Sequence, residues 1–133
     1  MKTTKKGFTL IELIVVIAII AVLAAILVPA MLGYIRKSKV SSANSAAATL
    51  YKGINTALTE LDEAGGYVKA DTYDSLSIDS AITNKPTNFD FEKSVKKFAK
   101  IPTGATIAYS IDSQACISAA MAVNDTYTGT YPS

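Results

Sequence analysis

Glu12 is the residue whose position most needs an explanation. It lies near the start of an apolar run from Phe8 to Leu32, and no Lys, Arg or His occurs between Phe8 and Tyr34. A charged side chain near the centre of a bilayer costs roughly 2.5 to 3.5 kcal/mol on insertion scales, so such a residue usually has a function and a partner. The segment itself offers no side chain that could neutralise the Glu12 carboxylate.

A counter-charge would arise if the chain were cut between Gly7 and Phe8. The new α-amine of Phe8 would then lie four residues before Glu12, one helical turn away on the same face. It could neutralise Glu12 of its own chain or of a neighbouring copy, and the second pairing would fix the axial offset between identical helices. At about 4 Å and an effective dielectric near 20, such a pair is worth roughly 4 kcal/mol before desolvation is subtracted.

The run from Lys5 to Glu12, together with Pro29 in the apolar segment, resembles the N-terminus of a type IV prepilin over about residues 1 to 40. The resemblance implies that a prepilin peptidase cuts after Gly7 and that the new N-terminus at Phe8 is methylated. It also implies that Glu12 pairs with the Phe8 amine of an adjacent subunit during assembly. Pro29 would lie in a stretch that can lose helical structure on assembly, and the alternative is a tolerated kink in a membrane helix.

An ordinary secretory signal peptide or signal anchor is the competing interpretation of this segment. The apolar part of a secretory signal spans 7 to 15 residues and ends at a small-x-small cleavage site. Here the run extends from Phe8 to Leu32, Glu12 stands near its start, and Val22-Leu23-Ala24 is only a weak site of that kind. As a helix the run is long enough to cross a bilayer with some tilt.

The helical pattern continues beyond the apolar run as an amphipathic stripe that ends before Gly65-Gly66. Its members repeat with steps of three and four: Val40, Ala43, Ala47, Leu50, Ile54, Ala57 and Leu61. We therefore predict four parts: a leader (1–7), a hydrophobic transmembrane and assembly helix (8–33), the amphipathic half of the same helix (34–64), and a connecting loop with a small β-sheet (65–133). Helix and sheet together would form one globular head.

Alternation of apolar and polar residues predicts strands in the C-terminal region. The inward positions expected in the first two strands are Ile107, Tyr109 and Ile111, then Ala115, Ile117, Ala119, Met121 and Val123. A turn at Asp112-Ser113 would join them, and a turn at Asn124-Asp125 would lead to a third strand over Thr126 to Tyr131. The predicted fold class is α+β, a long helix packed on a small antiparallel sheet, which agrees with the pilin fold.

A short helix is predicted over Phe89 to Lys100, between the connecting loop (65–88) and the strands. Its apolar face would hold Phe91, Val95 and Phe98, and its basic face Lys93, Lys96, Lys97 and Lys100. The basic face is either a solvated outer surface or a docking surface for a neighbouring subunit or an anionic partner. In the loop, Asp71, Asp74 and Asp79 do not have the spacing of an EF-hand.

Composition argues against enzymatic chemistry. The chain has no His, which excludes Ser-His and Cys-His nucleophiles, and it has no phosphate-binding glycine loop. Cys116 is its only cysteine, so no intrachain disulfide can form, and we expect it to be a small buried residue. The formal charge is +2, and without Lys2, Lys5 and Lys6 ten basic residues remain against eleven acidic ones. We predict no catalytic residue, no metal, no cofactor and no specific nucleic acid.

The predicted function is that of a structural pilus subunit. Its partners would be other subunits in a homopolymer, the prepilin peptidase and methylase, and the assembly platform with its ATPase. It would cross the inner or cytoplasmic membrane once before assembly and then lie in a cell-surface pilus, where adhesion is a typical role. The alternatives are a pseudopilin of a type II secretion or competence system and, more distantly, a signal-anchored monomeric binding domain.

Overall fold

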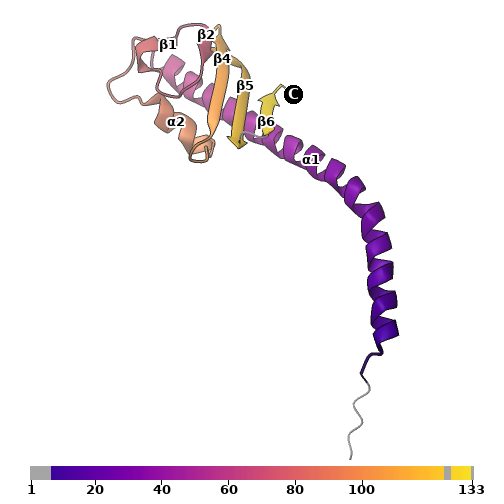
Figure 1. Cartoon of the computed structure of the whole chain (residues 1–133). Helices are drawn as coiled ribbons and strands as arrows, with labels where there is room; N and C mark the ends of the chain where they lie inside the picture. Colours follow the sequence, from indigo (N-terminus) through magenta and orange to yellow (C-terminus); the bar gives the residue numbers. More distant parts are fainter. Residues whose placement is uncertain (1–6, 125–126, 133) are drawn as a thin grey trace, which may run out of the picture. The chain divides into compact units, whose positions relative to one another are not determined.

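The computed structural model describes residues 7–124 and 127–132, without the side chains of residues 123 and 124. The chain divides after Lys37 into two compact units, and helix α1 begins in the first and ends in the second (Figure 1). The helices are α1 (Leu10–Glu63), α2 (Phe91–Phe98) and the short 3-10 helix η1 (Asp79–Ala81). The strands are β1 (Tyr67–Val68), β2 (Asp71–Tyr73), β3 (Ile82–Thr83), β4 (Thr106–Asp112), β5 (Ala115–Asn124) and β6 (Tyr127–Tyr131).

The first unit is a single stretch of helix without a core. Every described residue up to Lys37 is exposed, and an 18-residue window of α1 has a mean hydropathy of 3.3, long and apolar enough to cross a membrane. The helix is continuous through Pro29 and Gly33. Loss of one backbone donor at Pro29 therefore does not break α1, and the role of Pro29 in assembly stays a prediction.

The second unit is a helix packed against an antiparallel sheet, which confirms the predicted α+β class. Four strands are ordered β2-β4-β5-β6, and β1 and β3 form a separate antiparallel pair. The segment from 65 to 88 is thus more structured than the connecting loop we expected, because it holds β1, β2, η1 and β3. Strands of two or three residues are too short to show a period-two pattern in the sequence.

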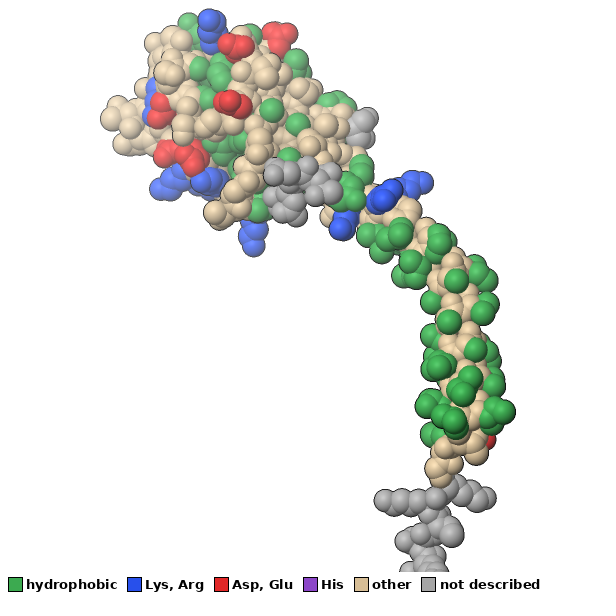
Figure 2. Space-filling model, in the orientation of Figure 1, with side chains coloured by type: hydrophobic (Ala, Val, Ile, Leu, Met, Phe, Trp, Pro, Cys, Tyr) green, Lys and Arg blue, Asp and Glu red, His purple; other side chains and the backbone are tan. Residues whose placement is uncertain are grey.

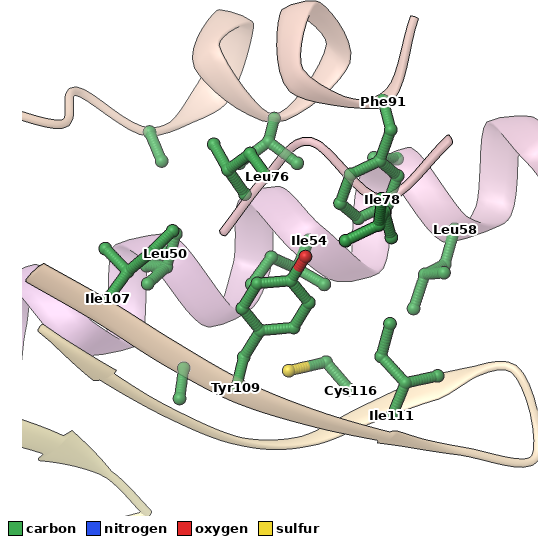
Figure 3. Packing of buried hydrophobic residues seen from close by; sticks show 14 of the residues in the cluster. Leu50, Ile54, Leu58, Leu76, Ile78, Phe91, Ile107, Tyr109, Ile111 and Cys116 are labelled. Carbon is green, nitrogen blue, oxygen red and sulfur yellow. The ribbon is translucent and has the colours of Figure 1, made fainter. Parts of the chain in front are cut away.

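The core of this second unit lies between α1 and strands β4 and β5, where the ring of Tyr109 stands among residues of several elements (Figure 3). Five of the seven predicted stripe residues are buried, whereas Ala43 is half-buried and Val40 is exposed. Leu58 and Gly53 are also buried on α1. The Tyr109 hydroxyl donates a hydrogen bond to the Ser75 carbonyl oxygen at 2.7 Å, so the one polar atom of this ring is satisfied.

Direct contacts between polar groups of α1 and the sheet fix how the two pack. The Asn44 side-chain oxygen accepts from the Thr130 N–H at 3.0 Å, and that of Asn55 accepts from the Cys116 N–H at 2.9 Å. At Gly129 the backbone of β6 approaches α1 so closely that a Cβ would clash with the backbone of Ala43. The helix therefore covers both the inner face of the sheet and part of its β6 edge.

Strand β5 departs from the predicted alternation at a β-bulge. The pairing steps from Ser110↔Ser118 to Ile111↔Cys116, which leaves Ile117 as an extra residue. Cys116 is buried as predicted, but Ile117 is 54% exposed, so the prediction that it points inward was wrong. The extra residue reverses the phase of the strand: Ala115 is exposed too, while Ala119 and Met121 face the core.

The turn between the first two predicted strands lies one residue later than predicted, because Asp112 is still paired in β4. Ser113 and Gln114 join β4 to β5 with positive φ angles of 51° and 64°, the backbone of a type I′ hairpin turn. Strand β6 confirms the predicted third strand within Tyr127–Tyr131, while Asp125 and Thr126 lie outside the described residues. The turn proposed at Asn124-Asp125 therefore stays a prediction.

Helix α2 confirms the predicted short helix, with one error in its apolar face. Phe91 and Val95 are fully buried, but Phe98 is 52% exposed and Ala99 enters the core in its place. The helix ends at Phe98, and Ala99 has extended backbone angles that turn the chain inward. Helical periodicity therefore fails at the last residue, where the helical geometry itself stops.

Candidate functional site

The first turn of α1 is closed by a reciprocal pair of hydrogen bonds between Thr9 and Glu12. The Thr9 N–H donates to Glu12 Oε2 at 3.1 Å, and the Glu12 N–H donates to Thr9 Oγ1 at 3.3 Å. This is a capping box, which satisfies two backbone donors that have no partner inside the helix. The role of Thr9 was not predicted, although the Thr-x-x-Glu spacing is a known signal for this cap.

The cap explains how a lone carboxylate is accommodated at this position. Glu12 is the third residue of α1, where the positive end of the helix dipole stabilises a negative charge. Its side chain is exposed, and no hydrogen bond besides that from Thr9 involves the carboxylate among the described residues. Oε1 is thus open to a further donor or cation.

The Gly7–Phe8 peptide bond lies outside the helix and is accessible. Both residues are non-helical, and the Phe8 side chain is 92% exposed. A Cβ built on Gly7 would meet no atom of the described residues within 4 Å, and its φ is not positive, so these residues give no steric reason for a glycine there. Residues 1–6, which include Lys5 and Lys6, lie outside the described part of the chain.

The helix that follows has an uninterrupted apolar surface. Figure 2 shows hydrophobic side chains along this stretch of α1, and the large ones from Leu10 to Ile35 are all between 41% and 76% exposed. A soluble monomer rarely exposes a continuous apolar patch larger than a few hundred Å². A helix that is apolar on every side is normally surrounded by lipid or by other helices.

The second unit holds no comparable candidate. Burial raises the pKa of the Cys116 thiol to about 11, so it stays protonated and unreactive near neutral pH. Burial also raises the pKa of Tyr109. Within residues 7–124 and 127–132, no three acidic, cysteine or histidine side chains gather as a metal-binding group, and Asp79 instead forms an ion pair with Lys85 at 2.9 Å.

Four residues were predicted as sites, and three of them, Gly7, Phe8 and Glu12, lie at or just before the N-terminal end of α1. Phe8 is separated from Glu12 by the capping residue and one turn of helix, whereas Pro29 lies far along the same helix. Asn124, part of a short glycosylation-type sequence, is followed by two residues outside the described ranges.

The family model that matches this chain covers the same N-terminal segment. Residues 2–28 match the family model described as the prokaryotic N-terminal methylation motif. A type IV major fimbrial protein FimA from Dichelobacter nodosus is 46% identical over 65 residues, which are 49% of this chain and 42% of the relative. A second FimA from the same organism is 47% identical over 60 residues, 45% of this chain and 38% of the relative. The match thus spans less than half the length of these relatives, and no solved structure matches.

Proposed function

We propose that this chain is a type IV pilin, a structural subunit that polymerises into a type IV pilus; the match of residues 2–28 to the N-terminal methylation motif supports this. The α+β fold is that expected of a pilin, and proteins of this kind are structural and not enzymes. The relatives are major fimbrial proteins, which favours a major subunit over a pseudopilin, although the pseudopilin alternative shares the same N-terminal segment.

Maturation would proceed at the accessible Gly7–Phe8 bond. A prepilin peptidase removes residues 1–7, and the new amine of Phe8 is methylated. The described residues give no steric need for a glycine at this position, which supports recognition of Gly7 by another protein. The mature subunit would span the membrane once through the helix from residue 8 to 33, with residues 34–133 outside.

Assembly would use the capped carboxylate of Glu12, and this is the observation that carries the proposal. In the single chain the Thr9 N–H and the helix dipole stabilise the charge of Glu12, so the subunit can remain in the membrane before assembly. After cleavage the Phe8 amine of another copy can approach the open Oε1. The exposed apolar helices of neighbouring subunits then pack against one another in the filament. The assembly platform and its ATPase drive their transfer out of the lipid.

Glu12→Gln and Glu12→Ala together test this role. Glutamine at this position still accepts the capping hydrogen bond but carries no charge, whereas alanine removes both. We expect both variants to reach the membrane and neither to form surface filaments, measured by electron microscopy and by the amount of subunit in sheared material. Asp112→Asn, which removes an exposed charge at the β4–β5 turn, serves as the control.

Normal filaments from the Glu12→Gln chain would show that the charge is not needed and would remove the pairing with Phe8. If Glu12→Gln assembles and Glu12→Ala does not, the cap is what matters. Both results differ from the expected loss in the two variants.

A further inference from the structure

The outer face of α2 is basic and exposed. Lys93, Lys97 and Lys100 are exposed, and among the described residues only Lys96 of this face forms an ion pair, with Glu92 at 2.5 Å. Phe98 adds a half-exposed aromatic ring. We call Lys93, Lys97, Phe98 and Lys100 the basic face.

Helix α2 presents this face from a fixed position. Asp90 caps its first turn by accepting from the Lys93 N–H at 3.0 Å. Its inner side is buried, and α2 approaches α1 closely at Gly53, where a Cβ would lie 3.2 Å from the Val95 carbonyl oxygen. A surface held so firmly loses little conformational entropy when a partner binds.

The C-terminal end of α1 carries the opposite charge. Glu60, Asp62 and Glu63 stand in its last turn, where negative charge is unfavourable beside the helix dipole. The helix ends in a Schellman turn at Gly65, with the Gly66 N–H donating to the Leu61 carbonyl oxygen at 2.9 Å. Directly after it, the ring of Tyr67 is 46% exposed. We call Glu60, Asp62, Glu63 and Tyr67 the acidic end.

None of these three carboxylates forms an ion pair within the described residues. The two surfaces therefore match in kind: each has charges without internal partners and one exposed aromatic ring, and the charges are of opposite sign. Opposite charges on facing surfaces steer association and fix its register. The unfavourable position of the carboxylates at the end of α1 is explained if they are used between subunits.

We propose that the basic face of one copy binds the acidic end of the next copy in the filament. This rests on the proposed function and adds the contact between heads to it. Both surfaces belong to the same compact unit but to different places on it, so the contact is heterologous and repeats in an open row instead of closing into a dimer. Helix α2 meets α1 near Gly53, whereas the acidic end lies at residues 60–63 of the same helix. At about 1.5 Å of rise per residue, successive heads would therefore be displaced along α1 by about 10 to 15 Å.

Charge exchange in the full-length chain tests the contact, in cells that carry the pilus assembly machinery. Lys93→Glu with Lys97→Glu reverses the basic face, and Asp62→Lys with Glu63→Lys reverses the acidic end. We expect each reversal alone to lower the subunit in sheared filaments about tenfold, and the combination of all four to restore it to within about twofold. Reversal at the acidic end removes an unfavourable dipole interaction, so misfolding of α1 would not explain a loss.

A control variant and a cross-linking experiment test whether the effect is specific to this contact. Asp112→Lys reverses an exposed charge at the β4–β5 turn and should leave the yield unchanged. A carbodiimide that joins amines to carboxylates without a spacer should link Lys93, Lys97 or Lys100 to Glu60, Asp62 or Glu63 of another subunit in wild-type filaments, detected by mass spectrometry.

Normal yield from both reversals, or no rescue by the combination, would overturn the contact while leaving the pilus function intact, because wild-type filaments would still form and still require Glu12. Reversal of the basic face that abolishes binding to heparin but not assembly would identify a polyanion as the partner and also overturn it. Failure of the wild-type chain to form filaments would instead contradict the proposed function.

Discussion

The two halves of α1 share one helix but are stabilised by different means. From Leu10 to Lys37 no residue is buried, whereas seven are buried between Ala47 and Leu61. The second half is amphipathic and has its partner surface in the same chain, where β4, β5 and α2 cover it. The first half is apolar on all sides, so its partner must be lipid or other copies. Secondary structure alone therefore does not show which surface a helix packs against.

Removal of the first half gives the largest expected effect. A fragment of residues 38–133 retains every buried core residue, so we expect it to be a soluble, cooperatively folding monomer, while the full chain requires detergent or membrane. Size-exclusion chromatography and thermal unfolding followed by circular dichroism would measure this. A fragment that aggregates or melts without cooperativity would contradict the separation of the two halves.

A matched pair of leucines sharpens the comparison. Leu58→Ala should lower the free energy of unfolding of the head by about 2 to 5 kcal/mol, because it creates a cavity at a buried position. Leu23→Ala removes the same atoms from an exposed position and should leave head unfolding unchanged in detergent. Chemical denaturation of both full-length variants provides the measurement, and equal losses would show that the first half also packs within the chain.

A pair of glycines should give effects of opposite sign. Gly129→Ala places a methyl group against the backbone of Ala43 and should cost about 1 to 3 kcal/mol of unfolding free energy. Gly33→Ala meets nothing within 4 Å inside a helix, and should increase helix stability by up to about 1 kcal/mol. Denaturation of the first and helix content of the second by circular dichroism would test this, and a tolerated Gly129→Ala would mean that β6 does not approach α1 so closely.

The smallest effect concerns pH and is confined to the head. The pKa of the Cys116 thiol rises from 9.0 to about 11 on folding because of burial. Between these values the unfolded chain loses the proton while the folded chain keeps it, so stability falls as pH rises from about 9 to 11. In Cys116→Ala this fall should be shallower, and the raised pKa values of Tyr109 and Tyr73 should contribute to what remains. An unchanged slope in the variant would contradict burial of the thiol.

Long periodic patterns were sufficient to predict most of the fold. The stripe along α1 and the inward residues of β4 followed from periods that extend over five residues or more, and the position of β6 followed from the turn signal before it. The bulge at Ile117 could not be predicted, because one inserted residue reverses the phase without changing composition. The short strands β1, β2 and β3 depend on tertiary pairing and leave no local pattern.

Part of the candidate site could be predicted from the sequence. The isolation of Glu12 in an apolar run and the Gly7–Phe8 sequence were visible in the sequence, and their roles in processing and assembly stay predictions. The cap formed with Thr9 was not predicted, although its Thr-x-x-Glu spacing is equally visible in the sequence. The exposure of Phe98 on α2 needed the structure, because it depends on where the helix ends.

Intact mass and N-terminal sequencing of the protein in sheared cell-surface material test the central claim most directly. A chain that begins at Phe8 and carries one added methyl group is the predicted result, since it requires cleavage after Gly7, methylation and export into a filament. A chain that still begins at Met1, or one cut near Ala24, would contradict the pilin function and indicate a signal-anchored or secreted domain.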